Sequence, residues 1–177
     1  MDIVVAVDKN WGIGYENTQP IVIPEDRKHF RRVTGSGTVI VGRKTLADFP
    51  GGKPLPGRRN IVLSRDRSLE IPGAEVVSCL DELFEKLGSE GAGAVESRSE
   101  SDGVYVIGGE SVYRLLLPYC RYAYLTKIYA APPADTFFPD LDKDENWVLE
   151  SVEKEDEASG VKYAFMRYEN KNVKRWK

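Results

Sequence analysis

Short apolar segments alternate with amphipathic segments along the first two thirds of the chain, and this alternation restricts the folds open to it. The apolar segments are β-branched or aromatic and are bounded by Gly, Pro or charge, which predicts strands over 3–7, 38–41, 60–64, 104–107 and 122–129. The amphipathic segments predict helices over 24–34, 44–49, 80–87 and 110–117. Strands that alternate with single helices pair mostly in parallel. The sequence therefore predicts an α/β fold with a twisted, mostly parallel central sheet and about four flanking helices.

The last third of the chain has a different pattern. Strand-like stretches over 147–152 and 161–168 surround the turn-like residues 156–160, which predicts an antiparallel hairpin at one end of the sheet. Residues 88–103 form a low-complexity insert in which 12 of 16 residues are Gly, Ser, Glu or Asp. We expect this insert to be a mobile surface loop within a single domain over 1–169. For the basic tail, 170–177, a weak docking segment is the alternative, but a frayed, solvated terminus is favoured.

Composition excludes several functional classes. The longest strictly apolar run, 3–7, is far too short to span a membrane, and no signal-peptide core follows Met1. A pI near 5.4 gives no support for nucleic acid as a partner. The single histidine, His29, excludes a two-histidine metal site, and no metal is expected. Cys79 and Cys120 lie in no motif, which favours reduced thiols and a cytoplasmic protein.

Two common nucleotide motifs are approached but not met. Residues 11–17 begin like a dinucleotide-binding fingerprint, but Asn17 replaces the third glycine and a polar loop follows. Residues 37–45 have one residue too many before Lys44 for a P-loop, and their inter-glycine stretch is an apolar strand. The chain also contains no Gly-x-Ser-x-Gly nucleophile elbow.

Polar residues do follow three of the expected parallel strands. These strand ends are Gly42-Arg43-Lys44-Thr45, Leu63-Ser64-Arg65 and the stretch Gly108-Gly109-Glu110-Ser111. Ligands of open α/β sheets gather at the carboxyl ends of the strands, where backbone N–H groups and cations can hold an anion. Ordinary loop chemistry explains any one of these ends equally well. All three together favour a phosphate-rich cofactor.

The order of the motifs resembles dihydrofolate reductase of the bacterial chromosomal type. The resemblance runs from residue 2 to about residue 168, interrupted by the insert. It rests on these segments: 6–14 (AVDKNWGIG), 24–30 (PEDRKHF), 41–45 (VGRKT), 54–60 (PLPGRRN), 106–109 (VIGG), 125–126 (LT) and 135–139 (DTFFP). It implies hydride transfer from NADPH to dihydrofolate, inhibition by antifolates, and a monomer.

The resemblance implies a small catalytic set. Asp26 matches the family's single active-site acid, Thr126 matches the threonine that hydrogen-bonds it, and Tyr113 lies along the cofactor. The helical spacing places Asp26 on one face with Phe30 and Val33, but Glu25 would complement the helix dipole equally well. Only the motif selects Asp26. His29 is given no catalytic role.

The resemblance also implies the two binding surfaces. The pterin and benzoyl side is formed by Val4, Val5, Ala6, Ile21, Arg27, Phe30, Phe49, Leu55, Arg58 and Ile107. For Phe30, Phe49 and Leu55, ordinary core packing is a strong alternative. Arg58 is expected to clamp the glutamate α-carboxylate, whereas Arg59 is expected to be a solvated loop cation.

The implied cofactor side is larger. It consists of Ala6, Ile13, Gly14, Asn17, Gly42, Arg43, Lys44, Thr45, Leu63, Ser64, Arg65, Gly108, Gly109, Glu110, Ser111, Val112 and Tyr113. Arg43 with Ser64 or Arg65 would meet a 2′-phosphate, which favours NADPH over NADH. Gly108 and Gly109 match the family's cis glycine pair, and residues 10–20 match the loop that closes over the nicotinamide.

Two positions depart from the family pattern. Pro20 is followed by Ile21 rather than tryptophan, and Gln19 stands where an apolar residue is common. Arg27 replaces a leucine-like contact to the substrate tail, which predicts altered binding of folate tails and antifolates. Two alternatives therefore stay open: a related pterin or pyrimidine reductase of the same fold, and a non-catalytic paralogue that binds folate or NADPH.

Overall fold

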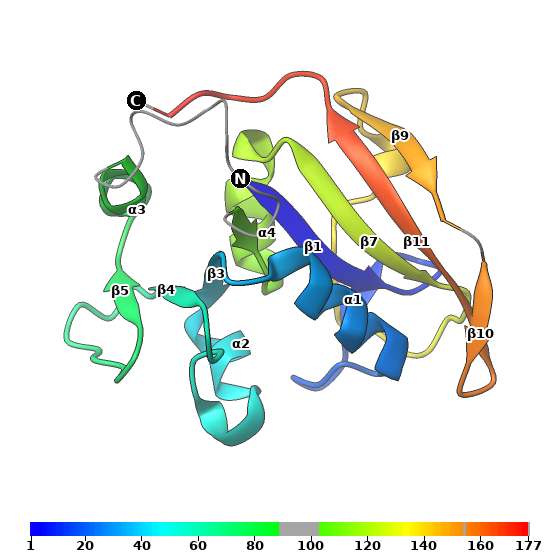
Figure 1. Cartoon of the computed structure of the whole chain (residues 1–177), viewed down its shortest axis with the longest axis horizontal. Helices are drawn as coiled ribbons and strands as arrows, with labels where there is room; N and C mark the ends of the chain where they lie inside the picture. The colour runs from blue at the N-terminus through cyan, green and yellow to red at the C-terminus, as the bar shows by residue number, and fades with distance from the viewer. Residues whose placement is uncertain (89–102, 154, 177) are drawn as a thin grey trace.

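The computed structural model describes residues 1–88, 103–153 and 155–176. Its main sheet has the strand order β10-β11-β7-β1-β6-β3-β4-β5, and β9 also pairs with β11 (Figure 1). The strands from β5 to β7 in this order are parallel, while β11 runs antiparallel to β7, β9 and β10. Their bounds are β1 Asp2–Val7, β3 Thr38–Gly42, β4 Arg59–Leu63, β5 Glu75–Val77, β6 Val104–Val106, β7 Tyr122–Ile128, β9 Trp147–Val152, β10 Asp156–Ala158 and β11 Val161–Asn170. The predicted α/β sheet with a C-terminal antiparallel segment is confirmed.

The four expected helices are present as α1 Pro24–Thr34, α2 Arg43–Ala47, α3 Leu80–Gly88 and α4 Glu110–Leu116. Single 3-10 turns occur at Pro50–Gly52, Leu117–Tyr119 and Leu141–Lys143. The bounds of α1 agree with the sequence signals: Pro24 begins it, and the N–H of Gly35 bonds to the carbonyl of Arg31 at 3.0 Å. None of the helices in the described ranges combines the length and apolar character that a membrane crossing requires.

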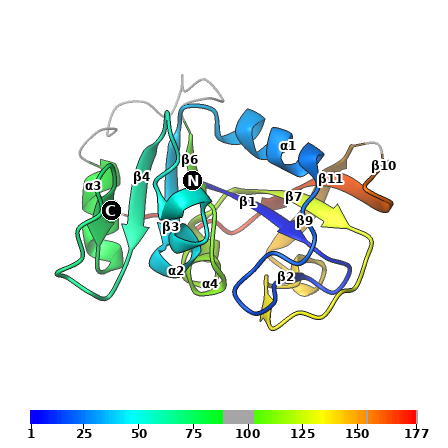
Figure 2. The same ribbon diagram turned by 90° about the horizontal axis from the view of Figure 1, so that it is seen from below.

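Two buried clusters lie on opposite faces of the sheet, because side chains alternate along each strand. On β1, Ile3, Val5 and Val7 join the cluster that α3 and α4 cover. Val4 joins the other cluster, which Phe30 and Val33 of α1 cover. Figure 2 shows α1 apart from α4, on the other side of the sheet. Helix α1 therefore packs on the face of the sheet that carries Val4.

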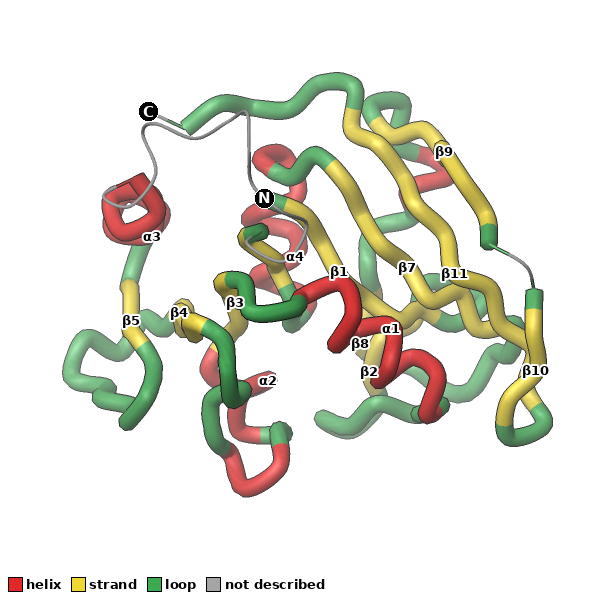
Figure 3. The backbone as a smooth tube through the Cα atoms, in the orientation of Figure 1, coloured by secondary structure: helices red, strands yellow, loops and turns green. Residues whose placement is uncertain are grey.

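Four strands were not expected from the sequence, including β5 and β10 of the main sheet. β5 has three residues, and β2 (Gly12–Gly14) and β8 (Thr136–Phe137) form a separate two-stranded sheet that is visible in the backbone trace of Figure 3. The expected turn over 156–160 is also shorter than predicted, because β10 occupies its first three residues. Ser159 and Gly160 make the turn, both with positive φ.

The tail is not frayed, contrary to the expectation. The N–H of Lys174 donates to the carbonyl of Pro118 at 2.8 Å, and the indole of Trp176 stacks on Phe84 of α3 with ring centroids 5.4 Å apart. Phe84 also contacts Tyr119, so α3 offers the tail an aromatic surface to bury. The expected mobile loop at 88–103 lies, apart from its two end residues, outside the described residues.

Candidate active site

The acid selected by the motif is joined to the sheet by a hydrogen bond. Asp26 lies in the first turn of α1, and Thr126 lies on β7 and is 1% exposed. The Thr126 hydroxyl donates to Oδ1 of Asp26 at 2.6 Å. Burial raises the pKa of the Asp26 carboxyl, while the Thr126 bond and the charge of Arg27 oppose this rise. Asp26 is thus a partly desolvated acid with a fixed orientation.

An apolar surface lies beside this acid on the same face of the sheet. Val4 and Ile107 are buried there, and Phe30, Phe49 and Leu55 pack against them while remaining partly exposed. Ala6 and Ile21 belong to a neighbouring cluster around Ile23. The side chain of Val5 points to the opposite face, so this predicted residue can reach a ligand here only through its backbone. A flat ring could therefore lie on this surface with Asp26 at its edge.

The three polar strand ends come together, as expected from parallel pairing. Gly42 pairs with Leu63, so Arg43 and Lys44 follow β3 where Ser64 and Arg65 follow β4. Ile40 pairs with Val106, which brings the stretch after β6 to the same edge. Arg43, Lys44 and Arg65 are exposed, whereas Ser64 is buried. This edge of the sheet presents three cations to a ligand.

Gly108 and Gly109 lie between the polar edge and the apolar surface. Their peptide bond is cis, as the resemblance implies. Gly108 has a φ of 115°, and its carbonyl accepts the N–H of Gly42 at 2.7 Å. A Cβ on Gly109 would lie 2.7 Å from the Thr45 hydroxyl, so any other residue would have to displace the Thr45 side chain. The Tyr113 hydroxyl donates to the Val4 carbonyl at 2.9 Å, and burial raises its pKa.

Several predicted cofactor residues have side chains committed to other contacts. Ile13, Leu63 and Val112 pack into the cluster beneath α4. Glu110 forms an ion pair with Arg114 at 3.0 Å. These residues could contact a cofactor mainly through their backbones, whereas Ser111 is exposed.

The loop over 10–20 contacts residues 135–138, for which no function was predicted. The N–H of Glu16 donates to the Asp135 carboxylate at 2.8 Å, and the N–H of Asp135 donates to the Gly14 carbonyl at 2.9 Å. Asn17 is exposed and has a positive φ of 64°. A small cavity lies between this loop and β1, lined in part by Ala6, Ile13 and Ile21. Residues 135–138 therefore support the loop beside the apolar surface.

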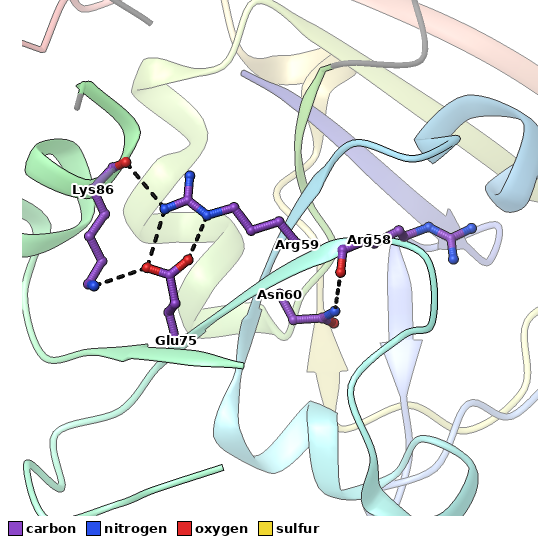
Figure 4. Close-up of polar contacts among 5 residues, drawn as sticks. All are labelled: Arg58, Arg59, Asn60, Glu75 and Lys86. Atoms are coloured by element: carbon purple, nitrogen blue, oxygen red, sulfur yellow. Dashed lines mark hydrogen bonds and ion pairs between the residues drawn. The ribbon is translucent and has the colours of Figure 1, made fainter. Parts of the chain in front are cut away.

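Arg58 and Arg59 point in different directions (Figure 4). Nε of Arg58 donates to the Thr34 hydroxyl at 2.9 Å, and its guanidinium lies 5.8 Å from the centroid of the Phe30 ring. Nε and Nη2 of Arg59 instead contact the Glu75 carboxylate at 2.6 and 3.2 Å. The expectation of a solvated Arg59 is wrong. Successive side chains point to opposite faces where β4 begins, so Arg58 and Arg59 diverge and Arg59 faces α3. Arg58 remains directed to the apolar surface.

Two further features stand apart from this region. A cavity of about 530 Å³ lies between β5 and α3 and is lined by charges of both signs, including Arg67 and Glu82, but by none of the predicted site residues. His29 stacks on Phe165 with centroids 4.0 Å apart, and burial lowers its pKa to about 4. No group of three His, Cys, Asp or Glu in the described ranges is arranged to hold a metal ion.

The polar edge, the glycine pair and the partly desolvated acid Asp26 place this chain among the α/β reductases that bind a nucleotide along the strand ends. The family model for dihydrofolate reductase matches residues 1–170. The dihydrofolate reductase of Bacillus subtilis is 34% identical over 174 residues, covering 97% of this chain and 95% of that protein. That of Staphylococcus haemolyticus is 34% identical over 171 residues, covering 96% and 95%. The chain belongs to the dihydrofolate reductase family.

A solved structure agrees with this assignment. The dihydrofolate reductase of Enterococcus faecalis, complexed with NADP(H) and RAB-propyl, superposes with a TM-score of 0.77 at 28% identity. The match covers 96% of this chain and 95% of that one. The family and the fold predicted from the motifs are both confirmed.

Proposed function

We propose that this chain catalyses the NADPH-dependent reduction of 7,8-dihydrofolate to tetrahydrofolate, and that Asp26 is its acid. The observation that carries the proposal is the Thr126–Asp26 hydrogen bond of 2.6 Å beside the apolar surface of Val4 and Ile107. A desolvated carboxyl next to an apolar surface needs a polar ligand. The amino-pyrimidine edge of a pterin offers two N–H donors to such a carboxylate.

Asp26 has two tasks in this proposal. Its carboxylate accepts both hydrogen bonds from the pterin edge, which holds the ring in register. Its negative charge also favours the protonated form of the ring, which is the form that accepts a hydride. Thr126 keeps the carboxylate oriented. Tyr113 completes the set, because its hydroxyl fixes the Val4 carbonyl next to the Gly108–Gly109 pair.

The strand-end residues fit NADPH. Gly108 and Gly109 leave a surface without side chains, where a nicotinamide ring can approach the backbone. Gly42, Arg43, Lys44 and Thr45 would hold the pyrophosphate, and Arg43 with Ser64 or Arg65 would hold the 2′-phosphate. Bound NADPH supplies the hydride. Ala6, together with Gly14 and Asn17 of the loop over 10–20, would help to exclude water from the nicotinamide.

The rest of the folate lies along α1. Phe30, Phe49 and Leu55 would pack the benzoyl ring, and Arg58 would clamp the glutamate α-carboxylate. Arg27 is exposed next to Asp26 and adds a cation to the substrate side. Ile21 stands in place of the tryptophan that the family pattern has after Pro20, so proton delivery to the ring depends on solvent reaching this edge.

The decisive test is NADPH oxidation by the purified chain with 7,8-dihydrofolate as substrate, followed at 25 °C. We expect multiple turnovers, stoichiometric tetrahydrofolate, and a strong preference over NADH. Absence of turnover together with tight NADPH binding would instead support a non-catalytic paralogue. Turnover of a pterin that lacks the glutamate tail at equal efficiency would support a pterin reductase, since such a substrate has no use for Arg58.

We further propose that the chain acts as a monomeric, single-domain cytoplasmic enzyme over 1–169. Neither cysteine forms a disulfide: Cys79 is exposed and Cys120 is buried. Two unpaired thiols suit a reducing compartment. Light scattering of the purified chain tests the monomer, and a dimeric mass at micromolar concentration would contradict it.

A further inference from the structure

Trp11 is held in an aromatic box where the loop over 10–20 begins. It is 6% exposed and has a positive φ of 66°. Phe138 stacks near its ring with centroids 6.3 Å apart, and Tyr168 approaches edge-on at 6.1 Å. The Trp11 carbonyl accepts the N–H of Phe138 at 2.8 Å. Because Gly12 follows directly, the placement of this indole determines where the loop leaves β1.

A lysine completes the box from the sheet. Nζ of Lys127 lies 3.9 Å from the centroid of the Trp11 ring, and the residue is 9% exposed. Within the described part of the chain Lys127 forms no salt bridge. The carboxylates that act on it, those of Asp142, Asp140 and Asp8, do so from longer range. A mostly buried ammonium is costly unless it gains an attractive partner, and the face of an indole is the strongest aromatic partner for a cation.

The nearby carboxylates already have other partners. Oδ1 of Asp8 accepts the N–H groups of Asn10 and Gly12 at 2.7 and 2.8 Å. Oδ1 of Asp142 accepts the Tyr168 hydroxyl at 2.7 Å. Asp8 and Asp142 therefore bind groups at the edges of this aromatic cluster, and the ammonium of Lys127 contacts the Trp11 ring instead. Lys127 thus acts on Trp11 rather than on any one acid.

We propose that Lys127 is a positioning residue for the cofactor loop and that it acts through Trp11. Lys127 follows Thr126 on β7, and successive side chains of a strand point to opposite faces. Thr126 contacts Asp26 on the substrate side, and Lys127 contacts Trp11 on the other side. One strand therefore aligns the acid and the loop as adjacent residues. This inference rests on the proposed function, because the loop is assigned to NADPH there.

Lys127→Met keeps the length and packing of the side chain and removes its charge. A cation–π contact is worth enough to change NADPH affinity about three- to tenfold if the loop depends on it. We expect the Kd for NADPH, measured by quenching of tryptophan emission, to rise by that factor. The Kd for dihydrofolate should stay within about twofold, because its surface lies on the opposite face of β7. Lys127→Arg, which retains the cation, should restore part of the loss.

Arg121→Met is the matched control. Arg121 lies just before the other end of β7, with its guanidinium 4.8 Å from the centroid of the Tyr122 ring, so this variant removes a cation–π contact far from the loop. It should leave NADPH affinity unchanged. The double variant Lys127→Met/Trp11→Leu should bind NADPH no more weakly than Trp11→Leu alone, since both changes break one contact.

The outcomes separate this inference from the proposed function. Turnover of dihydrofolate by the wild type establishes the function whatever the variants show. Given NADPH binding by the wild type, equal NADPH affinity in Lys127→Met and Arg121→Met would overturn the inference. Equal losses of affinity for NADPH and dihydrofolate would also overturn it, because they would show a general structural role. Fully additive losses in the double variant would show that Lys127 does not act through Trp11.

Discussion

Thr126 donates a hydrogen bond of 2.6 Å to Asp26, across 100 residues of sequence. This bond has an electrostatic consequence as well as a geometric one. Burial pushes the pKa of Asp26 up, and the bond from Thr126 is the larger of the two influences that hold it down, ahead of the charge of Arg27. The pKa of Asp26 on α1 therefore depends on its burial, which raises it, and on the hydrogen bond from Thr126 of β7, which lowers it.

Asp26→Asn should remove activity and raise stability. Loss of the carboxylate removes both the register of the pterin and its protonation, so kcat/KM should fall about 10²-fold or more. The folded-state pKa of Asp26 lies above its unfolded value. Its favourable contribution to the free energy of unfolding is therefore present at low pH, where the carboxyl is protonated, and is lost as pH rises through the folded pKa. At pH 7 the ionised form costs stability, and the variant should gain about 0.5–2 kcal/mol in urea unfolding.

Glu25→Gln is the control for that experiment. Glu25 occupies the same first turn of α1, and the sequence alone could not exclude it as the acid. Its variant should keep activity. Comparable loss of activity in the two variants, or undiminished turnover in Asp26→Asn, would contradict the assignment.

Thr126→Val should shift the pH dependence of the reaction. Without the hydroxyl, the larger of the two influences that lower the pKa of Asp26 is lost, so the ionisation seen in the profile of kcat/KM against pH should move to higher pH. A hydrogen bond to a charged group is worth enough to lower kcat/KM about tenfold at pH 7. Thr126→Ser retains the hydroxyl and should keep the wild-type profile. Identical profiles for Val and Ser would show that the bond does not act on the acid.

Much of the fold follows from local patterns. The alternation of Ile3, Val4 and Val5 places successive side chains in opposite clusters, and Pro24 and Gly35 bound α1 as expected. β2, β5 and β8 could not be predicted, because strands of two or three residues exist only through partners distant in sequence. β10 was also missed, because its three residues pair across a tight turn with β11 and read as part of that turn. The docked tail has the same origin: Trp176 is ordered by Phe84, which lies on another element.

The site was predictable where parallel pairing decides it. Strand ends such as Gly42 and Leu63 meet because their strands are neighbours in register. The choice between Glu25 and Asp26 was not predictable from spacing, because it depends on the rotation of α1 over the sheet. The partner of Arg59 was also hidden, because Glu75 lies on a strand that has no clear sequence signal.

Arg58→Leu should weaken substrate binding without changing the fold. Loss of the guanidinium removes a charge-assisted contact to the glutamate α-carboxylate, so KM for dihydrofolate should rise about 10²-fold while kcat changes little. A pterin without the tail should be unaffected. Arg59→Met is the neighbouring control: it should leave KM unchanged and lower the free energy of unfolding. Equal effects of Arg58→Leu and Arg59→Met on KM would contradict the assignment of Arg58 to the glutamate α-carboxylate.

Glu75 should contribute acid-sensitive stability. Arg59, and then Lys86, lower its pKa to about 2, from 4.5 in the unfolded chain. The contribution is therefore present above pH 4.5 and is lost as pH falls toward 2. Because about a third of the side chain is exposed, it amounts to about 1 kcal/mol after screening. The stability gap between wild type and Glu75→Gln in urea unfolding should shrink from pH 7 to pH 3. A constant gap would show that the ion pair is not its cause.

Arg27→Leu should change how tails and inhibitors bind. Arg27 is exposed, and its charge acts on the adjacent Asp26, so it lies near the acid that would bind the pyrimidine edge of an antifolate. A cation there repels a protonated diaminopyrimidine inhibitor and attracts the anionic folate tail. We expect the variant to bind such an inhibitor about three- to tenfold more tightly and to have a KM for dihydrofolate raised by a similar factor. Both effects should diminish at high salt, because the charge is exposed. Lys28→Leu removes the next cation on α1 and should change neither value. Equal inhibitor affinities for wild type and Arg27→Leu would show that this departure from the family pattern has no role in recognition.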